Sequence, residues 1–161
     1  MHNICIYTDG AAKGNPGRGG YGAIVVTVSS DGTHEEVEFS AGYSMTTNNR
    51  MELMAAIAAL QSVTEPSRIT ITSDSKYLVD AFNNHWIANW KRNGWRTSTG
   101  SVVKNRDLWE KLVALVAPHK VRFIWVKGHA GHPMNERCDY LATTAAEGEH
   151  LLVDTGATPF L

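Results

Sequence analysis

The sequence has 161 residues, of which 43% are apolar and 19% charged, and its formal net charge is −1. This composition is typical of a single globular domain, and it argues against a uniformly basic nucleic-acid-binding coat. The longest apolar run, Leu53 to Leu60, is far shorter than the about 20 residues of a membrane span. Met1 to Gly10 has no basic and apolar signal regions, so we expect a cytoplasmic protein with no membrane partner.

The first half of the chain predicts three strands and then a helix. The strands are the apolar, β-rich runs at 4–8, 21–28 and 35–43. Asp9-Gly10 is interpreted as the turn that ends the first strand, and Asp31-Gly32 as the turn of a hairpin between the second and third. From Asn49, the run RMELMAAIAALQSV contains strong helix formers and is apolar on nearly every face. It therefore predicts a buried helix.

The second half alternates helices with strands. The predicted elements are a strand at 68–72, short helices at 75–83 and 85–93, a helix at 107–117, a strand at 121–126 and a helix at 135–147. Helical connections between strands indicate parallel crossovers. The predicted fold class is α/β, with a mixed five-stranded sheet (three antiparallel and then parallel strands) flanked by helices. We expect residues 1–147 to form one domain and residues 148–161 a loosely held C-terminal tail.

A glycine-rich segment, GRGGYG at 17–22, has the GxGxxG spacing of dinucleotide-binding sites. That fingerprint requires a strand before the glycines and a helix after them, whereas here a strand follows. We therefore reject a dinucleotide site. The glycines are interpreted as turn and close-approach positions beside a strand.

Four of the 16 acidic residues have positions that suggest a site: Asp9, Glu52, Asp74 and Asp139. Asp9 and Asp74 follow predicted strands, and ligands often bind at the carboxyl ends of strands in α/β sheets. Glu52 has an alternative structural role, because Asn49 as N-cap and Glu52 would form a variant capping box. Asp139 alone would be an ordinary charge on a helix surface. If the four converge, their repulsion requires cations, and oxygen ligands favour Mg²⁺ or Mn²⁺ over Zn²⁺.

A cluster of two such ions would suit phosphodiester cleavage, since it can activate a water and stabilise the leaving alkoxide. A second feature indicates nucleic acid as the partner. Residues 81–106 contain no Asp or Glu, and their cations are Lys91, Arg92, Arg96, Lys104 and Arg106. Four of the five tryptophans lie in or beside this stretch, at positions 86, 90, 95 and 109. Cations and aromatic rings together suit phosphates and bases, although tryptophans at helical spacing are also common in cores.

Two histidines, His129 and His132 (GHAGH), follow the last predicted strand. Their HxxH spacing would suit zinc, but no cysteine or third histidine lies nearby in the sequence to complete such a site. A loop histidine titrates near neutral pH, so His129 is a candidate proton carrier. The alternative is a solvated histidine without a function.

The sequence resembles the type 1 ribonuclease H family along essentially its whole length. The blocks that carry the resemblance are YTDG (7–10), GNPG (14–17), GGYGAI (19–24), TTNNRMELMAAIAAL (46–60), SDSKY (73–77), NWKRNGW (89–95), VKNRDLW (103–109) and VKGHAGHPMNERCDYLA (126–142). The resemblance implies a monomeric endonuclease that cuts the RNA strand of RNA–DNA hybrids. It implies two Mg²⁺ ions per active site, with Mn²⁺ as a substitute, and products with 5′-phosphate and 3′-hydroxyl ends.

The resemblance also implies roles for individual residues. Asp9, Glu52, Asp74 and Asp139 would hold the metal ions, and His129 would assist proton transfer or product release. Contacts to the hybrid would come from Asn15, Asn48 and Asn49 (RNA 2′-hydroxyls), Thr47, Arg50 and Asn105 (a DNA phosphate), Tyr77, Trp86 and Trp90 (the DNA channel), and Lys91, Arg92 and Arg96 (a basic protrusion). Ala11-Ala12 and Lys76 depart from the usual Ser-Cys and Gln, and Lys76 is included as an RNA contact. The alternatives are a hybrid-binding or double-stranded-RNA-binding module without cleavage, and a related transposase or junction nuclease.

Overall fold

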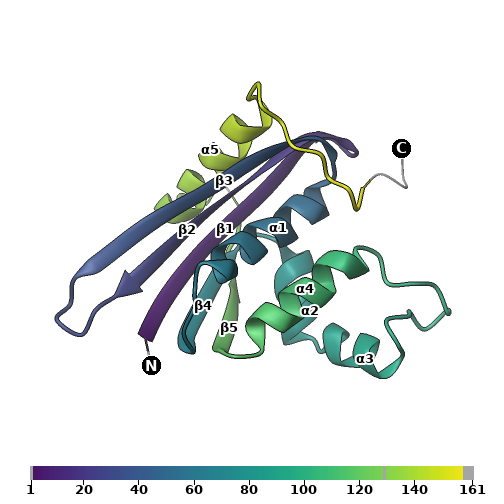
Figure 1. The fold of residues 1–161 in the computed structure, drawn as a ribbon, viewed down its shortest axis with the longest axis horizontal. Coiled ribbons are helices and arrows are strands. Elements are labelled where there is room, and N and C mark those ends of the chain that lie inside the picture. The colour runs from purple at the N-terminus through teal and green to yellow at the C-terminus, as the bar shows by residue number, and fades with distance from the viewer. Residues whose placement is uncertain (1, 129, 158–161) are drawn as a thin grey trace.

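A computed structural model describes residues 2–128 and 130–157, and it contains one five-stranded sheet with helices on both faces (Figure 1). The strands are β1 (His2–Gly14), β2 (Gly17–Val28), β3 (His34–Thr46), β4 (Ser67–Ser73) and β5 (Lys120–Trp125). Their order in the sheet is β3-β2-β1-β4-β5. The β1–β2 and β2–β3 pairs are antiparallel, whereas β1–β4 and β4–β5 are parallel. The predicted fold class is confirmed.

The helices are α1 (Asn48–Gln61), α2 (Lys76–Asn83), α3 (Trp86–Arg92), α4 (Arg106–Val116) and α5 (Pro133–Ala146). Helix α1 packs on β1 and β2 and is itself covered by α4. Helix α5 lies on the opposite face of the sheet, against β1, β2 and β3 (Figure 1). No helix in the described part of the chain is both long and apolar enough to span a membrane.

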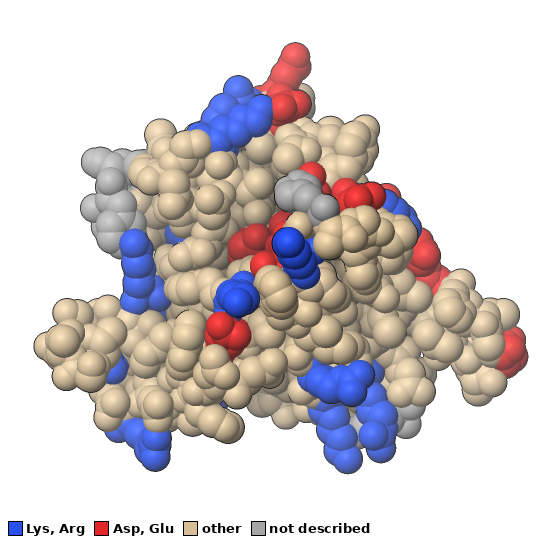
Figure 2. Space-filling model, turned by 180° about the vertical axis from the view of Figure 1, so that it is seen from behind, with Lys and Arg blue, Asp and Glu red and all other residues tan. Residues whose placement is uncertain are grey.

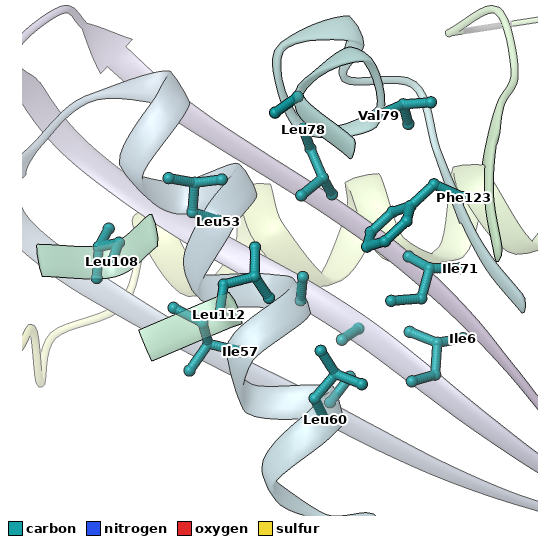
Figure 3. Close-up of a cluster of buried hydrophobic side chains, with 14 of the residues drawn as sticks. Ile6, Leu53, Ile57, Leu60, Ile71, Leu78, Val79, Leu108, Leu112 and Phe123 are labelled. Carbon is teal, nitrogen blue, oxygen red and sulfur yellow. The ribbon is translucent and has the colours of Figure 1, made fainter. Parts of the chain in front are cut away.

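The main core lies between the sheet and the helices of the α1 side (Figure 3). Leu53 and Leu60 of α1 are fully enclosed, as are Leu112 of α4 and Ile71 of β4. The helix α1 has buried residues around its whole circumference, because it is sandwiched between the sheet and α4. The prediction of a buried helix is therefore confirmed, and the packing of α1 between the sheet and α4 positions its first turn.

The first strand is longer than the sequence predicted. Asp9-Gly10 does not form a turn: β1 continues to Gly14, with Asp9 paired to Gly22. The glycine-rich segment is the first half of β2 rather than a loop. A side chain at Gly22 would place its Cβ 2.4 Å from the carbonyl oxygen of Cys138 in α5. The interpretation of this glycine as a close-approach position is therefore confirmed, and dinucleotide binding has no support.

The C-terminal segment was expected to be loosely held, and this expectation is wrong for residues 151–157. Ser44 donates a backbone hydrogen bond to Leu152 at 2.9 Å, and Leu152 donates one to Gly42 at 2.8 Å. Asp154 and Ala157 are buried. The segment therefore runs along the end of β3 and is anchored by a buried carboxylate, which the polar composition of this short segment did not reveal.

Candidate active site

The pairing of β1 with β4 brings two carboxylates together. Thr8 and Ser73 are partners in this parallel pair, so the next residues, Asp9 and Asp74, lie side by side. Asp9 lies within β1 and not after it, whereas Asp74 directly follows β4. The Asp9 carboxylate accepts a hydrogen bond from the backbone N–H of Gly10 at 2.9 Å.

Gly10 lets the first turn of α1 approach the sheet at this point. A Cβ on Gly10 would lie 2.4 Å from the backbone nitrogen of Glu52. The alternative role of Glu52 in a capping box with Asn49 is wrong, because the N-cap is Thr47, whose hydroxyl accepts a hydrogen bond from the Arg50 N–H at 3.2 Å. Glu52 is therefore not used for capping. Its carboxyl is buried, and its Oε2 has no hydrogen-bond partner among the described residues.

Three carboxylates form a tight cluster: one oxygen each of Asp9, Glu52 and Asp74 lies within 4.8 Å of the others. Burial raises the pKa of Asp9 to about 8, and repulsion from Asp74 and Asp139 adds to the effect. Burial, followed by repulsion from Asp9 and Asp74, also raises the pKa of Glu52 well above its usual range. A cluster of this kind is strongly unfavourable when fully ionised without a counter-ion.

The fourth acidic residue, Asp139, comes from α5 on the other side of the sheet. Gly22 allows the backbone of α5 to pass close to β2 at Cys138, opposite Asp9. Asp139 is half-buried, and both its charge and a hydrogen bond to Asp9 raise the pKa of Asp9. It lies outside the tight group of three but beside it. Four segments distant in the sequence thus bring their carboxylates to one place.

The donor set of this cluster fits a hard divalent cation. All candidate ligands are carboxylate oxygens, the kind preferred by Mg²⁺ and Mn²⁺. The unpartnered Oε2 of Glu52 is a buried acceptor that a cation would satisfy. A bound cation would also remove the repulsion that raises the pKa of Asp9 and Glu52.

Two of the predicted RNA-contacting asparagines meet beside this cluster. The Oδ1 atom of Asn48 accepts a hydrogen bond from the backbone N–H of Ala12 at 2.6 Å. The Asn48 N–H donates to Oδ1 of Asn15 at 3.2 Å. Asn15, Asn48 and Asn49 are all exposed. The first turn of α1 therefore presents amide groups next to the carboxylates.

Arg50 has a different environment from the one expected of a phosphate ligand. Its side chain is only 2% exposed, and it forms paired hydrogen bonds with Asp154 and Asp107. Its Nη1 also donates to Oδ1 of Asn105 at 3.2 Å. All N–H groups of the guanidinium face a partner, so it has no donor left for a phosphate. The structure thus corrects the expected direct contact: Arg50 is a buried support for Asn105, while Thr47 caps α1 nearby.

Neither Asp107 nor Asp154 was identified from the sequence as a partner of Arg50. Asp154 is 104 residues away from Arg50 in the chain, and no local pattern connects the two. Thr46 adds a third buried contact, because its hydroxyl donates to Asp154 at 2.7 Å. The only sequence signal was a buried arginine near the start of an apolar helix, which requires acidic partners from elsewhere.

The aromatic residues of the predicted DNA channel are partly core residues. The Tyr77 hydroxyl accepts hydrogen bonds from Asn105 at 3.1 Å and from Trp109 at 3.0 Å. Trp90 contacts Trp86, Trp95 and Trp109 through its ring. Trp86 and Trp90 remain half-buried, so each presents part of its ring at the surface.

The remaining predicted residues lie near the surface. Lys91, Arg92 and Arg96 are exposed, at the end of α3 and in the following loop. Lys76 is exposed, and its Nζ lies 4.8 Å from the ring centre of Trp125. His132 is the N-cap of α5, and its Nδ1 accepts from the Asn135 N–H at 3.3 Å. His129 lies outside the described residues.

The sequence of this chain matches a known protein family. The family model described as RNase H matches residues 1–147. The chain belongs to the ribonuclease H family. Ribonuclease H of Lachnoclostridium phytofermentans is 55% identical over 152 residues, which cover 94% of this chain and 96% of that protein. Ribonuclease HI of Synechocystis is 50% identical over 159 residues, which cover 99% and 97%.

Solved structures of ribonucleases H share the fold. LC9-RNase H1, described as a type 1 RNase H with the type 2 active-site motif, has a TM-score of 0.84 at 33% identity. The match covers 99% of this chain and 81% of that chain. LC11-RNase H1, solved in complex with an RNA/DNA hybrid, has a TM-score of 0.61 at 24% identity, covers 89% of this chain and 96% of that chain, and supports the fold alone. The resemblance identified from the sequence motifs is confirmed, and with it the enzyme class: ribonucleases H are nucleases.

Proposed function

We propose that this ribonuclease H is a Mg²⁺-dependent endonuclease that hydrolyses the RNA strand of RNA–DNA hybrids. The observation that carries the proposal is the cluster of Asp9, Glu52 and Asp74, in which one buried oxygen of Glu52 has no hydrogen-bond partner within residues 2–128 and 130–157. Such a cluster is unfavourable in an inert protein and is useful in an enzyme that handles phosphates through cations. Family membership supports the same reaction.

In this proposal, Asp9, Glu52, Asp74 and Asp139 hold two Mg²⁺ ions, for which Mn²⁺ can substitute. When bound, the metal pair supplies an activated water and stabilises the leaving oxygen, so that the products carry 5′-phosphate and 3′-hydroxyl ends. Asp9 and Glu52 must be ionised to act as ligands, because their neutral forms would bind the cation weakly. We assign His129 to proton transfer or product release. All four carboxylates come from one chain, which supports action as a monomer.

Selection of the hybrid would come from the surface around the cluster. Asn15, Asn48 and Asn49 carry amide groups that can both donate to and accept from a ribose 2′-hydroxyl. The DNA strand would be held by Thr47 and Asn105 at a phosphate, supported by Arg50, by the exposed parts of Tyr77, Trp86 and Trp90, and by the cations Lys91, Arg92 and Arg96. Lys76 is placed beside Asp74 as a further RNA contact. The uneven distribution of amides and cations supports recognition of two chemically different strands.

A cleavage assay on three labelled substrates tests the proposal. An RNA–DNA hybrid, a double-stranded DNA and a double-stranded RNA of one sequence are incubated with the protein, each with Mg²⁺ and with a chelator. We expect internal cleavage of the RNA strand only, in the hybrid only, and only with Mg²⁺. Binding of the hybrid without cleavage would instead support a binding module. Cleavage of double-stranded DNA would support a related transposase or junction nuclease.

A further inference from the structure

A second group of cations lies on the part of the sheet that α5 leaves open. Helix α5 packs on β1, β2 and β3, so the same face of β4 and β5 is accessible. Arg68 of β4 and Lys120 and Arg122 of β5 are exposed there. In Figure 2, acidic side chains lie near the centre of the view, and a separate group of Lys and Arg lies at its lower edge over the starts of β4 and β5.

These three cations, here called the β4–β5 patch, are held close together by the strand register. Arg68 and Lys120 are direct partners across the β4–β5 pair, and Arg122 is the partner of Thr70. Like charges placed directly opposite each other destabilise a sheet. Among the described residues, none of the three cations forms a salt bridge or a side-chain hydrogen bond. The patch therefore retains an uncompensated positive charge that an external anion would neutralise.

The surface around the patch is hollowed. The three cations line a depression of about 480 Å³, and its other lining residues are Asn3, Ile4, Cys5, Ile69, Thr70 and Val121. No carboxylate is among them. Lys120 and Arg122 are two residues apart in β5, so their side chains point to the same face about 6.6 Å from each other. A polyanion with closely spaced charges would contact both.

We propose that the β4–β5 patch binds the single-stranded continuation of a nucleic acid whose hybrid portion occupies the active site. This inference rests on the proposed function. Arg68 lies six residues before Asp74, which corresponds to about 20 Å along a strand. A duplex is stiff over this distance, with a persistence length of about 50 nm, whereas a single strand can turn from the active site to the patch. The patch thus favours hybrids next to unpaired nucleic acid.

An acidic peptide is a less favourable occupant. A peptide that adds to a sheet uses the free backbone groups of the edge strand, and β5 is that edge. Its Phe123 carbonyl already accepts a hydrogen bond from the side chain of Asn83 at 3.1 Å. A nucleic acid, by contrast, is already brought to this molecule by the proposed reaction and needs no edge hydrogen bonds.

The test compares the binding of a short blunt hybrid with that of the same hybrid carrying a single-stranded DNA overhang long enough to span about 20 Å. Overhangs of both polarities are measured, with a chelator present so that no strand is cut. For wild type, we expect tighter binding of the overhang substrate in at least one polarity. With three phosphate contacts and a slope of about −0.7 each, this advantage should fall about 20-fold between 50 and 200 mM salt.

The variant Lys120→Gln/Arg122→Gln removes two of the three contacts, so its overhang advantage should change by only about 3-fold over the same salt range. The control Lys111→Gln/Arg137→Gln loses the same charge elsewhere, on α4 and α5, together with the exposed ion pairs of Arg137 with Glu36 and Glu38. It should keep the wild-type advantage. A single cooperative unfolding transition in each variant would show that both are folded. An overhang that adds no affinity to wild type, or an advantage that is as large and as salt-dependent in the patch variant as in wild type, would overturn the proposal.

In a last measurement, the binding of a glutamate-rich peptide with the same charge as the overhang is compared with that of the DNA strand. If the peptide binds wild type more tightly than the DNA strand does, the patch is a peptide site and the proposal fails. Failure of the proposed function gives a different result from failure of the patch proposal, because the blunt hybrid itself would then be neither bound nor cut. Failure of the patch proposal leaves binding and cleavage of the blunt hybrid intact.

Discussion

Arg50 and Glu52 lie two residues apart near the start of α1, and both are buried, but their charged groups have opposite environments. The Arg50 guanidinium faces two carboxylates and an amide oxygen, which together occupy all of its donors. The Glu52 carboxyl faces two other carboxylates, and one of its oxygens has no hydrogen-bond partner in the part of the chain that the structure describes. The start of α1 therefore contains two different buried charges. Arg50 is neutralised by carboxylates of the protein itself, whereas Glu52 lies where a bound cation would neutralise it.

This difference separates a structural centre, Arg50 with its carboxylate partners, from a functional centre, the carboxylate cluster around Glu52. A buried charge with internal partners adds no binding capacity, but it is costly to disrupt, because its partners are left unpaired. A buried charge without such partners is unfavourable, and either protonation or a bound cation relieves it. Changes at the two centres should therefore have opposite consequences for stability and activity.

The largest expected effect is on cleavage, in the variant Asp9→Asn. The substitution removes one ligand charge and keeps nearly the same shape, so we expect cleavage of the hybrid to fall more than ~100-fold. Hybrid binding should change little, because the amide, aromatic and cationic contacts remain. Single-turnover cleavage and equilibrium binding measure the two quantities separately. Residual activity above roughly a tenth of wild type would contradict the assignment of Asp9 as a ligand.

The next largest effect is on folding, in the variant Arg50→Ala. This change leaves Asp154 buried without its cation, and we expect the free energy of unfolding to fall by about 3–5 kcal/mol. The control Arg106→Ala removes an exposed pair with Glu110 and should cost no more than about 0.5 kcal/mol. Urea unfolding gives both values. If the two variants were equally stable, Arg50 would not be a structural centre.

A smaller effect is expected in how the free energy of unfolding of the metal-free protein depends on pH. Asp9 has a raised pKa of about 8, so between pH 4 and 8 the folded protein holds more protons than the unfolded chain, whose pKa for this group is about 3.9. Stability should therefore be greatest at the acidic end of this window and should fall as pH rises through it. Asp9→Asn stays neutral and should flatten this dependence, gaining about 2 kcal/mol or more at pH 8 relative to wild type.

Mg²⁺ provides the control for this pH effect. It should raise the unfolding midpoint of wild type at pH 8, because a ligand of the folded state stabilises it. The same addition should have little effect on Asp9→Asn. Thermal unfolding with and without the ion checks both statements, and a wild-type protein whose stability in chelator rises with pH over this window would contradict them.

The sequence predicted the sheet and singled out the four acidic residues that the fold brings together, but it predicted local details less well. Strands with alternating or continuous apolar residues are visible because their burial pattern is local. The end of β1 was misplaced, since Asp9-Gly10 has the composition of a turn while the tertiary contacts of α1 and β2 keep it extended. The N-cap was misplaced for a related reason: Thr47, Asn48 and Asn49 are all acceptable caps, and only packing selects Thr47.

The partners of Arg50 could not be predicted from the sequence, because a local pattern contains no information on long-range pairing. Asp107 belongs to α4 and Asp154 to the C-terminal segment, so the pairing depends on how three distant segments pack. Convergence of Asp139 with Asp9 has the same origin, because it requires α5 to lie close against Gly22. The family resemblance supplied residue roles that the pattern alone left open, but it also assigned Arg50 to a phosphate that its buried side chain does not face.

The smallest expected effect on stability comes from a third kind of charge, the exposed cations of the predicted protrusion. Lys91, Arg92 and Arg96 are exposed to solvent, so replacing all three with Ala should change the free energy of unfolding by no more than about 0.5 kcal/mol per site. Binding should respond instead: the log–log salt slope for the hybrid should fall by about 0.7–0.9 for each phosphate that the variant no longer neutralises. The cleavage rate of bound hybrid should be nearly unchanged, because the carboxylate cluster is untouched. Binding measured over a salt series checks this. An unaltered slope would show that these residues are only a solvated face, and a large loss of stability would place them with Arg50 among the charges that hold the fold together.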